Sequence, residues 1–273
     1  MTGAATRAVT IITGASEGIG HELARCFAAG GRDLLLIARS SGRLTRAAKK
    51  ISSQYGVTAT PLALDVTDKN APAAIDAALA NENAYADVLV NSAGMGLSGE
   101  FWSHGEDDIE RLLQLNVTAL TRLMRHFLPA MIERNAGGIL NVASLGGYVP
   151  GPCQAAYYAS KAYVISLSEA VAVEAGSHGV MICALAPGPF PSRFHEHMGS
   201  ENDLYYRWLP VMSAARAARS GYRGFLWRRR VVVPGVMNNI LALALRVTPH
   251  AITNPILALL LRRRPQGNNN VRQ

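Results

Sequence analysis

The sequence has few cysteines and no apolar run long enough to cross a bilayer. Its 273 residues include three cysteines, Cys26, Cys153 and Cys183. This odd number, without metal-ligand spacing, argues against a disulfide scaffold or a metal site and favours reduced thiols. The apolar stretches 236–247 and 251–261 are shorter than the about 20 residues of a membrane-spanning helix. The N-terminus shows no pattern of a secretion signal, so we expect a cytoplasmic protein.

Acidic residues are missing from the last quarter of the chain. Residues 204–273 contain 12 arginines and no Asp or Glu, whereas the whole chain has 27 Lys and Arg and 19 Asp and Glu. The preceding three quarters are therefore mildly acidic. A nucleic-acid-binding protein would spread basic charge over one face and interleave aromatic residues. We expect no nucleic-acid partner.

The chain has enough apolar residues for a sizeable core, since 49% are hydrophobic and 17% are charged. Short, continuous apolar runs, typical of strands buried on both faces, occur at residues 8–13, 33–38, 57–66, 87–91, 137–144 and 180–187. Segments with helical spacing lie between them at residues 19–29, 42–54, 68–80, 105–134 and 154–175. This alternation predicts an α/β protein with a doubly wound parallel sheet of the Rossmann type.

The pattern changes after the sixth strand. Residues 190–228 are expected to form an insertion that ends in a helix capped by Ser213, and residues 231–233 a seventh strand. We divide the chain into a Rossmann domain with dinucleotide-binding and catalytic functions, residues 1–235, and a helical C-terminal extension, residues 236–273.

A glycine-rich segment joins the first strand to the first helix. It reads TGASEGIG over residues 13–20, and its candidate cofactor-binding residues are Gly14, Ser16, Gly18, Ile19 and Gly20. Glycines let the backbone turn tightly and approach a pyrophosphate, whose charge is met by backbone amides and the helix dipole. The alternative is an ordinary glycine-rich turn between a strand and a helix.

The end of the second strand carries an arginine where an NAD-binding protein usually has an acidic residue. No Asp or Glu occurs from Leu34 to Thr60, and Arg39 follows the strand directly. A guanidinium suits the 2′-phosphate of NADP(H), whereas an acidic residue suits the free hydroxyl of NAD(H). The position therefore favours NADP(H), although a solvated surface arginine is the alternative.

Tyr157 and Lys161 are four residues apart on an expected helix and so share a face. A free tyrosine has a pKa of about 10, and a neighbouring ammonium favours the phenolate. The pair could therefore act in general acid or base catalysis, with Ser144 at the end of the fifth strand holding a carbonyl. Such a pair also occurs by chance in many helices.

Taken in order, these motifs resemble those of the short-chain dehydrogenase/reductase family, in its single-domain, NADP-preferring form, from residue 8 to about residue 192. The glycine-rich segment resembles the family's TGxxxGIG loop, Asn91–Gly94 its NNAG element, and Pro187-Gly188 the turn beside the nicotinamide. Asp65-Val66 is similar to its adenine-side turn. Two positions depart from the family pattern: Ser92 replaces an Asn, and Ser192 a Thr.

The resemblance implies two sets of site residues. The cofactor-binding set is Gly14, Ser16, Gly18, Ile19, Gly20, Arg39, Asp65, Val66, Asn91, Ala93, Gly94, Tyr157, Lys161, Pro187 and Gly188. The catalytic set is Asn116, Ser144, Tyr157 and Lys161. In these roles Tyr157 would protonate a carbonyl oxygen that Ser144 orients. Lys161 would lower the tyrosine pKa and hold the nicotinamide ribose, while Asn116 would support a water relay to Lys161.

These roles imply an NADP(H)-dependent oxidoreductase that reduces a ketone to an alcohol, or runs the reverse reaction. The residues that the resemblance places around the substrate are mostly apolar and indicate a lipophilic small molecule: Met95, Leu97, Tyr148, Val149, Cys153, Phe190 and Phe194. The alternative is a protein of the same fold that binds NADP(H) as a non-catalytic scaffold or sensor.

The basic extension indicates either a subunit interface or peripheral attachment to a membrane. Two short helices joined through Pro249 lack one long amphipathic face. The sequence therefore favours a homo-oligomer over a membrane contact.

Overall fold

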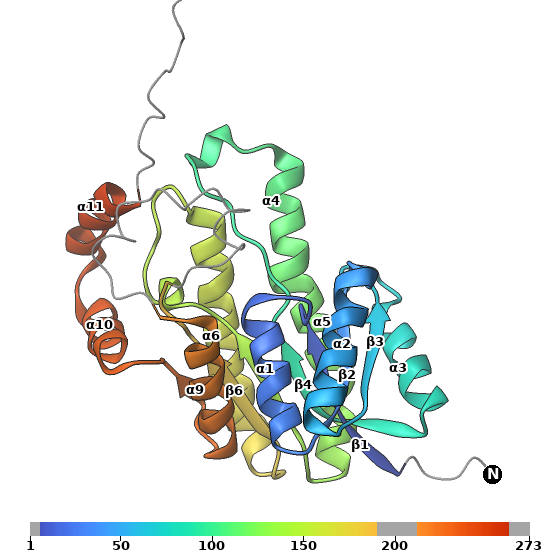
Figure 1. Ribbon diagram of the computed structural model, residues 1–273. Helices are drawn as coiled ribbons and strands as arrows, with labels where there is room; N and C mark the ends of the chain where they lie inside the picture. The colour runs from blue at the N-terminus through green and yellow to red at the C-terminus, as the bar shows by residue number, and fades with distance from the viewer. Residues whose placement is uncertain (1–5, 190–211, 262–273) are drawn as a thin grey trace, which may run out of the picture.

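The computed structural model describes residues 6–189 and 212–261, which form a seven-stranded parallel sheet between layers of helices (Figure 1). Most of the expected insertion, with Phe190, Ser192 and Phe194, lies outside the described residues. The strands are β1 (Arg7–Thr13), β2 (Asp33–Ala38), β3 (Ala59–Ala63), β4 (Ala84–Asn91), β5 (Gly138–Val142), β6 (Met181–Leu185) and β7 (Val231–Val232). The predicted Rossmann-type fold is confirmed.

The strand order places a crevice at the carboxyl ends of the central strands. The order is β3-β2-β1-β4-β5-β6-β7, and every neighbouring pair is parallel. The chain winds outward in one direction from β1 and in the other from β4, so the connections diverge above the carboxyl ends of these two strands. Ligands of doubly wound sheets bind at such a point.

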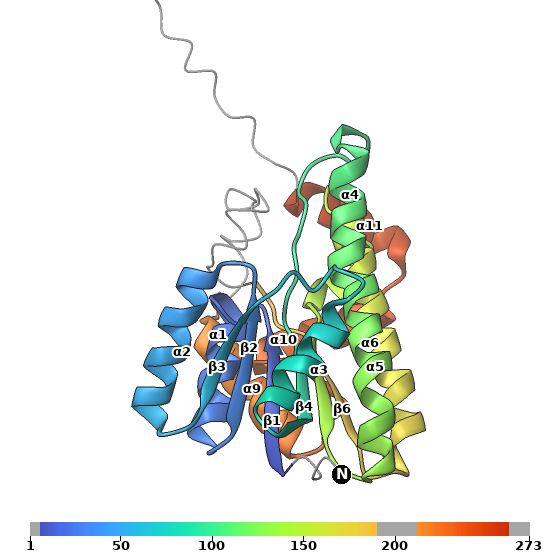
Figure 2. The ribbon, with the colours of Figure 1, turned by 90° about the vertical axis from the view of Figure 1, so that its right-hand side faces the viewer.

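Helices cover both faces of the sheet, as Figure 2 shows from the side. They are α1 (Gly18–Ala29), α2 (Ser41–Tyr55), α3 (Ala71–Asn81), α4 (Glu106–Leu113), α5 (Leu120–Glu133), α6 (Ala155–Gly176) and α9 (Ala214–Leu226). The sheet separates two cores, because alternate side chains of a strand point to opposite faces. Leu34 and Leu36 of β2 belong to the core that includes residues of α1 and α9, whereas Leu35 and Ile37 belong to the core that includes residues of α5 and α6.

The expected helix over residues 105–134 is interrupted by a wider turn. Residues Gln114–Ala119 form a π-helical segment, η2, between α4 and α5. Hydrophobic periodicity does not reveal such a segment, because it adds only a local change of phase to an otherwise helical pattern. Asn116 lies in it and is buried.

The C-terminal part follows the predicted order. Ser213 caps α9, accepting a hydrogen bond from the backbone N of Arg216 at 3.3 Å. Two helices then follow β7, α10 (Val236–Val247) and α11 (His250–Leu260). In Figure 1 they lie at one side of the α/β body. Among the helices of the described part, none is long and apolar enough to cross a membrane.

Candidate active site

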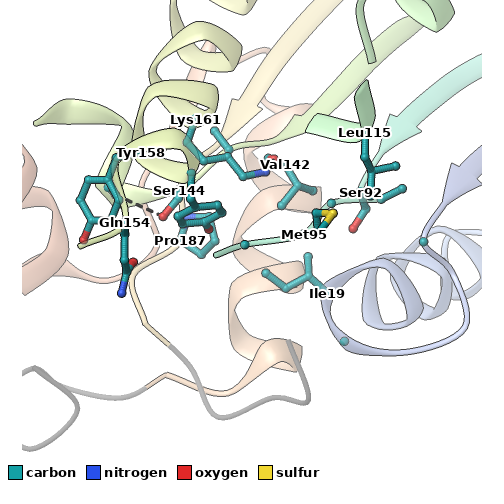
Figure 3. A pocket seen from close by; sticks show the side chains of 18 of the residues that line it. Ile19, Ser92, Met95, Leu115, Val142, Ser144, Gln154, Tyr158, Lys161 and Pro187 are labelled. Carbon is teal, nitrogen blue, oxygen red and sulfur yellow. Dashed lines mark hydrogen bonds between the residues drawn. The ribbon is translucent and has the colours of Figure 1, made fainter. Parts of the chain in front are cut away.

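A cavity of about 1710 Å³ lies at the carboxyl ends of the strands. Its walls come from the glycine-rich loop, the segments after β2 to β6, the first turns of α6, and the helices α10 and α11. Figure 3 shows Ser144 and Lys161 on one side of this cavity and Ile19 and Met95 across from them. Segments far apart in the sequence therefore meet around one space.

The glycine-rich loop has the backbone shape that binding an anion requires. Gly14 and Gly18 adopt φ angles of +66° and +63°, in the left-handed region. A Cβ on Gly20 would lie 2.4 Å from the carbonyl oxygen of Gly14, whereas one on Gly18 would meet nothing within 4 Å. Gly14 and Gly20 are thus fixed by close backbone packing, and Gly18 leaves open space beside the cavity.

The start of α1 is open to a ligand. Glu17, its N-cap residue, makes no capping hydrogen bond through its side chain, and its carboxylate lies 3.1 Å from Arg43. The residues of the first turn, Gly18, Ile19 and Gly20, all line the cavity together with Ser16. Uncapped amides and the positive end of the helix dipole make this cradle suitable for a pyrophosphate.

Thr13 joins the loop to the segment after β4. Its hydroxyl oxygen accepts hydrogen bonds from the backbone N atoms of Ser92 and Ala93, each at 3.0 Å. This positions Ala93 and Gly94, which line the cavity. Local sequence does not indicate this role of Thr13, because its partners are about 80 residues away.

The expected adenosine end of the site contains Arg39, Asp65 and Val66, which all line the cavity. Arg39 is exposed and has no hydrogen bond or ion pair with any other residue in the described part of the chain. Asp65 accepts hydrogen bonds from the backbone N and the hydroxyl of Thr67, at 3.0 and 2.8 Å. Arg39 is therefore available to an anionic group, whereas Asp65 fixes the turn.

Ser144, Tyr157 and Lys161 converge at the centre of the cavity. The Ser144 hydroxyl oxygen accepts a hydrogen bond from Gly146 N at 3.1 Å, and the Ser144 side chain also bonds to Tyr157. Lys161 Nζ donates to the carbonyl oxygen of Val142 at 3.0 Å and lies 5.8 Å from the centre of the Tyr157 ring. The structure thus brings together three of the four expected catalytic side chains.

Burial changes the acidity of both ionisable groups. It lowers the pKa of Lys161 from 10.5 to about 8 and raises the pKa of Tyr157 from 10.0 to about 12, although the bond to Ser144 acts to lower the latter. The family resemblance implies that Lys161 lowers the pKa of Tyr157. Burial raises that pKa instead, so Tyr157 is protonated at neutral pH.

Asn116, the fourth expected catalytic residue, lies behind the cavity wall. Its side-chain oxygen accepts from Met95 N at 2.9 Å, and its amide donates to Met95 O at 2.8 Å and to the Ser160 hydroxyl at 3.0 Å. Ser160 in turn donates to the carbonyl oxygen of Tyr157 at 2.7 Å. Both side-chain N–H groups of Asn116 are therefore used in holding the cavity wall, and its side-chain oxygen keeps one lone pair. The expected water relay to Lys161 stays a prediction.

Asn91 also differs from its expected place beside the cofactor. Its side chain is buried and donates to Asn141 Oδ1 at 2.9 Å, between β4 and β5, and it does not line the cavity. The resemblance alone suggested a contact with the cofactor. The structure instead gives Asn91 contacts within the sheet, just ahead of the cavity-lining segment.

Pro187 and Gly188 line the cavity and contact the C-terminal extension. The carbonyl oxygen of Pro187 accepts from Leu145 N at 2.8 Å. A Cβ on Gly188 would lie 2.7 Å from the side-chain nitrogen of Asn238, a buried residue of α10. The turn after β6 therefore fixes the position of α10.

The outer part of the cavity has mainly apolar walls. Of the described residues expected around the substrate, Met95 and Val149 line it, and Leu97, Tyr148 and Cys153 do not. The extension supplies a large part of this wall, which the sequence alone does not reveal: Leu241, Leu245, Thr248, Ile252, Thr253, Ile256, Leu257, Leu260 and Leu261. Their helical spacing predicts amphipathic helices but does not identify what the apolar side covers.

Two further residues face the cavity near Ser144. Gln154 is buried, and Tyr158 packs so closely against the loop before α6 that a Cβ on Gly151 would lie 2.3 Å from its ring. Figure 3 places both side chains on the same side of the cavity as Ser144. Only Tyr157 lies four residues before Lys161, on the same side of α6.

Comparisons with known proteins agree with this geometry. A family model described as short chain dehydrogenase matches residues 8–203. A short chain dehydrogenase of Pseudocercospora fijiensis (strain CIRAD86) is 38% identical over 184 residues, which are 67% of this chain but only 59% of that protein. The galactitol 2-dehydrogenase (L-tagatose-forming) of Cereibacter sphaeroides is 35% identical over 211 residues, 77% of this chain and 82% of the relative.

A similar solved structure extends the likeness over the whole fold. It is a short-chain dehydrogenase from Sphingobium yanoikuyae in complex with NADPH, with 31% sequence identity and a TM-score of 0.78. The superposition covers 97% of this chain and 100% of that one.

Proposed function

Because the chain belongs to the short-chain dehydrogenase/reductase family, we propose that it is an NADP(H)-dependent oxidoreductase that interconverts a lipophilic ketone and its alcohol. The observation that carries this proposal is the convergence of Ser144, Tyr157 and Lys161 at a cavity whose other wall is the glycine cradle. A reduced nicotinamide bound there would supply a hydride to the carbonyl carbon.

We assign the cofactor contacts by their place along the cavity. The amides at the start of α1 would hold the pyrophosphate, and Arg39 would bind the 2′-phosphate. Asp65 and Val66 would contact the adenine. Ala93, Gly94, Pro187 and Gly188 would hold the nicotinamide end, and Lys161 its ribose. The NADPH bound by the Sphingobium yanoikuyae relative supports NADP(H) as the cofactor.

In ketone reduction Tyr157 donates its phenolic proton to the carbonyl oxygen, while the Ser144 hydroxyl holds that oxygen by a hydrogen bond. A pKa of about 12 keeps Tyr157 protonated at neutral pH. It is still acidic enough to protonate the alkoxide that hydride addition generates. Asn116 acts as a positioning residue, because it holds Met95 and, through Ser160, the backbone of Tyr157.

The apolar outer wall supports a lipophilic substrate. Leu241 and Leu245 of α10 and Leu257 of α11 line it. Burying an apolar group against such side chains contributes about 25 cal/mol for each Å² removed from water. A substrate with an aliphatic or aromatic body beside its carbonyl therefore fits this cavity better than a polyol.

The test is a panel of ketones of increasing apolar size, assayed for NADPH oxidation with the protein and with Tyr157→Phe and Tyr158→Phe. We expect Tyr157→Phe to lower kcat about 100- to 10,000-fold, the usual contribution of a general acid, with NADPH affinity nearly unchanged. Tyr158→Phe keeps the packed ring and should remain active. Normal turnover by Tyr157→Phe, or no turnover of any ketone by a protein that binds NADPH, contradicts the proposal; the second result favours a non-catalytic scaffold.

A further inference from the structure

The helices of the extension carry apolar side chains on their outer side as well as in the cavity wall. The described part of the chain has 15 exposed large hydrophobic residues. Eight of them lie on α10 and α11 and are named here the outer face: Val236, Met237, Ile240, Leu243, Val247, Ile252, Ile256 and Leu259. Their exposed fractions are 55% or more. A concentration of this kind marks an interaction site.

The spacing of these residues matches helical stripes. On α10 the exposed positions Val236, Ile240, Leu243 and Val247 follow each other at intervals of four, three and four residues. Residues so spaced lie on one side of a helix. The same α10 buries Ala242 on its other side. The outer face is therefore an ordered feature of both helices and not a scatter of single exposed residues.

The extension is anchored to the body of the protein. The Arg246 guanidinium lies 4.5 Å from the centre of the Tyr148 ring and 3.7 Å from the Glu169 carboxylate of α6. Asn238 packs against Gly188, as described above. In Figure 1, α10 and α11 form one side of the molecule. The outer face thus has a fixed place on the fold, and Ile252 and Ile256 belong to both it and the cavity wall.

Charge decides which occupant fits this face. The extension, residues 236–273, contains five arginines and no acidic residue, and three of them, Arg262, Arg263 and Arg264, directly follow Leu261 in the sequence. A symmetric contact between two copies would bring this positive charge to both sides of the interface. An anionic lipid surface instead supplies the opposite charge together with an apolar interior.

We propose that the outer face binds the surface of an anionic lipid bilayer, with α10 and α11 lying along the headgroup boundary. Helices of 12 and 11 residues are too short to span a bilayer but long enough to lie in its surface. The sequence alone favours a subunit interface. In the structure, both helices carry exposed apolar stripes and also form part of the cavity wall. Together with the basic charge, these stripes favour a lipid surface over a second subunit. This proposal goes beyond the proposed enzyme function and does not depend on it.

The experiment is flotation of the full-length protein with two kinds of vesicle, phosphatidylcholine alone and phosphatidylcholine mixed with phosphatidylglycerol, at low and high salt. The test variant carries Leu243→Glu and Leu259→Glu, at positions that do not line the cavity. The control is Val173→Glu on α6, which is 61% exposed, compared with 64% for Leu243. Thermal unfolding and NADPH titration verify that each protein is folded.

We expect the unmodified protein and Val173→Glu to float with the anionic vesicles, more strongly at low salt. The double variant should bind the anionic vesicles at least about tenfold more weakly. It replaces two aliphatic side chains with two negative charges, which the anionic headgroups repel. Absence of flotation, or equal flotation of the double variant, overturns the proposal. So does a stable dimer in light scattering that the double substitution dissociates, since the face is then a contact between two copies.

Discussion

Asn116 binds Met95 at both polar groups of its backbone, accepting from Met95 N at 2.9 Å and donating to Met95 O at 2.8 Å. The two residues are 21 positions apart, and the contact joins the π-helical segment to the loop after β4. One side chain thereby fixes a cavity wall and, through Ser160, the start of α6.

The Asn116→Ala variant should be less stable by about 2 to 5 kcal/mol, because both Met95 groups lose their partner in a part-buried place. Urea unfolding measures the change. Asn239→Ala is the matched control: the Asn239 amide also makes two donor bonds, to the carbonyl oxygens of Val233 and Gly235, but the residue is exposed. Water replaces those bonds, so we expect a loss below about 1 kcal/mol. Equal losses in the two variants would contradict the positioning role of Asn116.

The Lys161→Met variant should lose activity yet gain stability at neutral pH. The lysine pKa is 10.5 in the unfolded chain and about 8 in the fold, so the unfolded state binds the proton more tightly. The penalty on the folded state is complete below about pH 8 and disappears as pH rises to about 10.5. Its size is about 3 kcal/mol, partly offset by the lost bond to Val142.

Unfolding measured between neutral pH and pH 10 tests this linkage. The advantage of Lys161→Met over the unmodified protein should shrink as pH rises. Lys50→Met, at an exposed position of α2, should change stability little throughout. A gap between Lys161→Met and the unmodified protein that is independent of pH shows that burial does not destabilise the ammonium of Lys161.

The Arg39→Ala variant should bind NADPH about tenfold to a hundredfold more weakly, the effect of losing a charge-assisted hydrogen bond of about 1.5 to 3 kcal/mol. NADH affinity should barely change, because NADH lacks the 2′-phosphate. Fluorescence titration of both cofactors measures the two affinities.

Arg43→Ala is the control for this prediction, since Arg43 also lines the cavity but is paired with Glu17. Its effect on NADPH should be smaller than that of Arg39→Ala. Equal weakening of NADPH and NADH by Arg39→Ala, or a preference of the unmodified protein for NADH, contradicts selection of the phosphate by Arg39.

The Thr253→Val variant should be more stable, by about 1 kcal/mol, because it removes a buried hydroxyl that lacks a hydrogen-bond partner in the described structure. The two side chains have nearly the same shape. Thr248→Val is the contrasting control. The Thr248 hydroxyl donates to the carbonyl oxygen of Ala244 at 2.7 Å, so removing it should slightly destabilise the protein. Thermal unfolding compares the pair, and destabilisation by Thr253→Val would show that the hydroxyl is satisfied.

Local patterns in the sequence were sufficient to predict the order of strands and helices and the glycine loop that opens α1. Continuous apolar runs such as that of β2 identify buried strands wherever they occur. A glycine loop opening a helix has few conformations, and Tyr157 and Lys161 share a face on any helix. All of these depend on residues close together in the chain.

Contacts between distant residues were decided by the tertiary structure. Asn91 and Asn116 do not line the cavity, and their side chains bond to Asn141 and Met95, which lie on other elements. The raised pKa of Tyr157 comes from burial, which only the assembled fold determines. The apolar pattern of α10 and α11 showed that the helices would be amphipathic. Only packing of α10 against Gly188 and Tyr148 assigned one side of α10 to the cavity wall and left the other exposed.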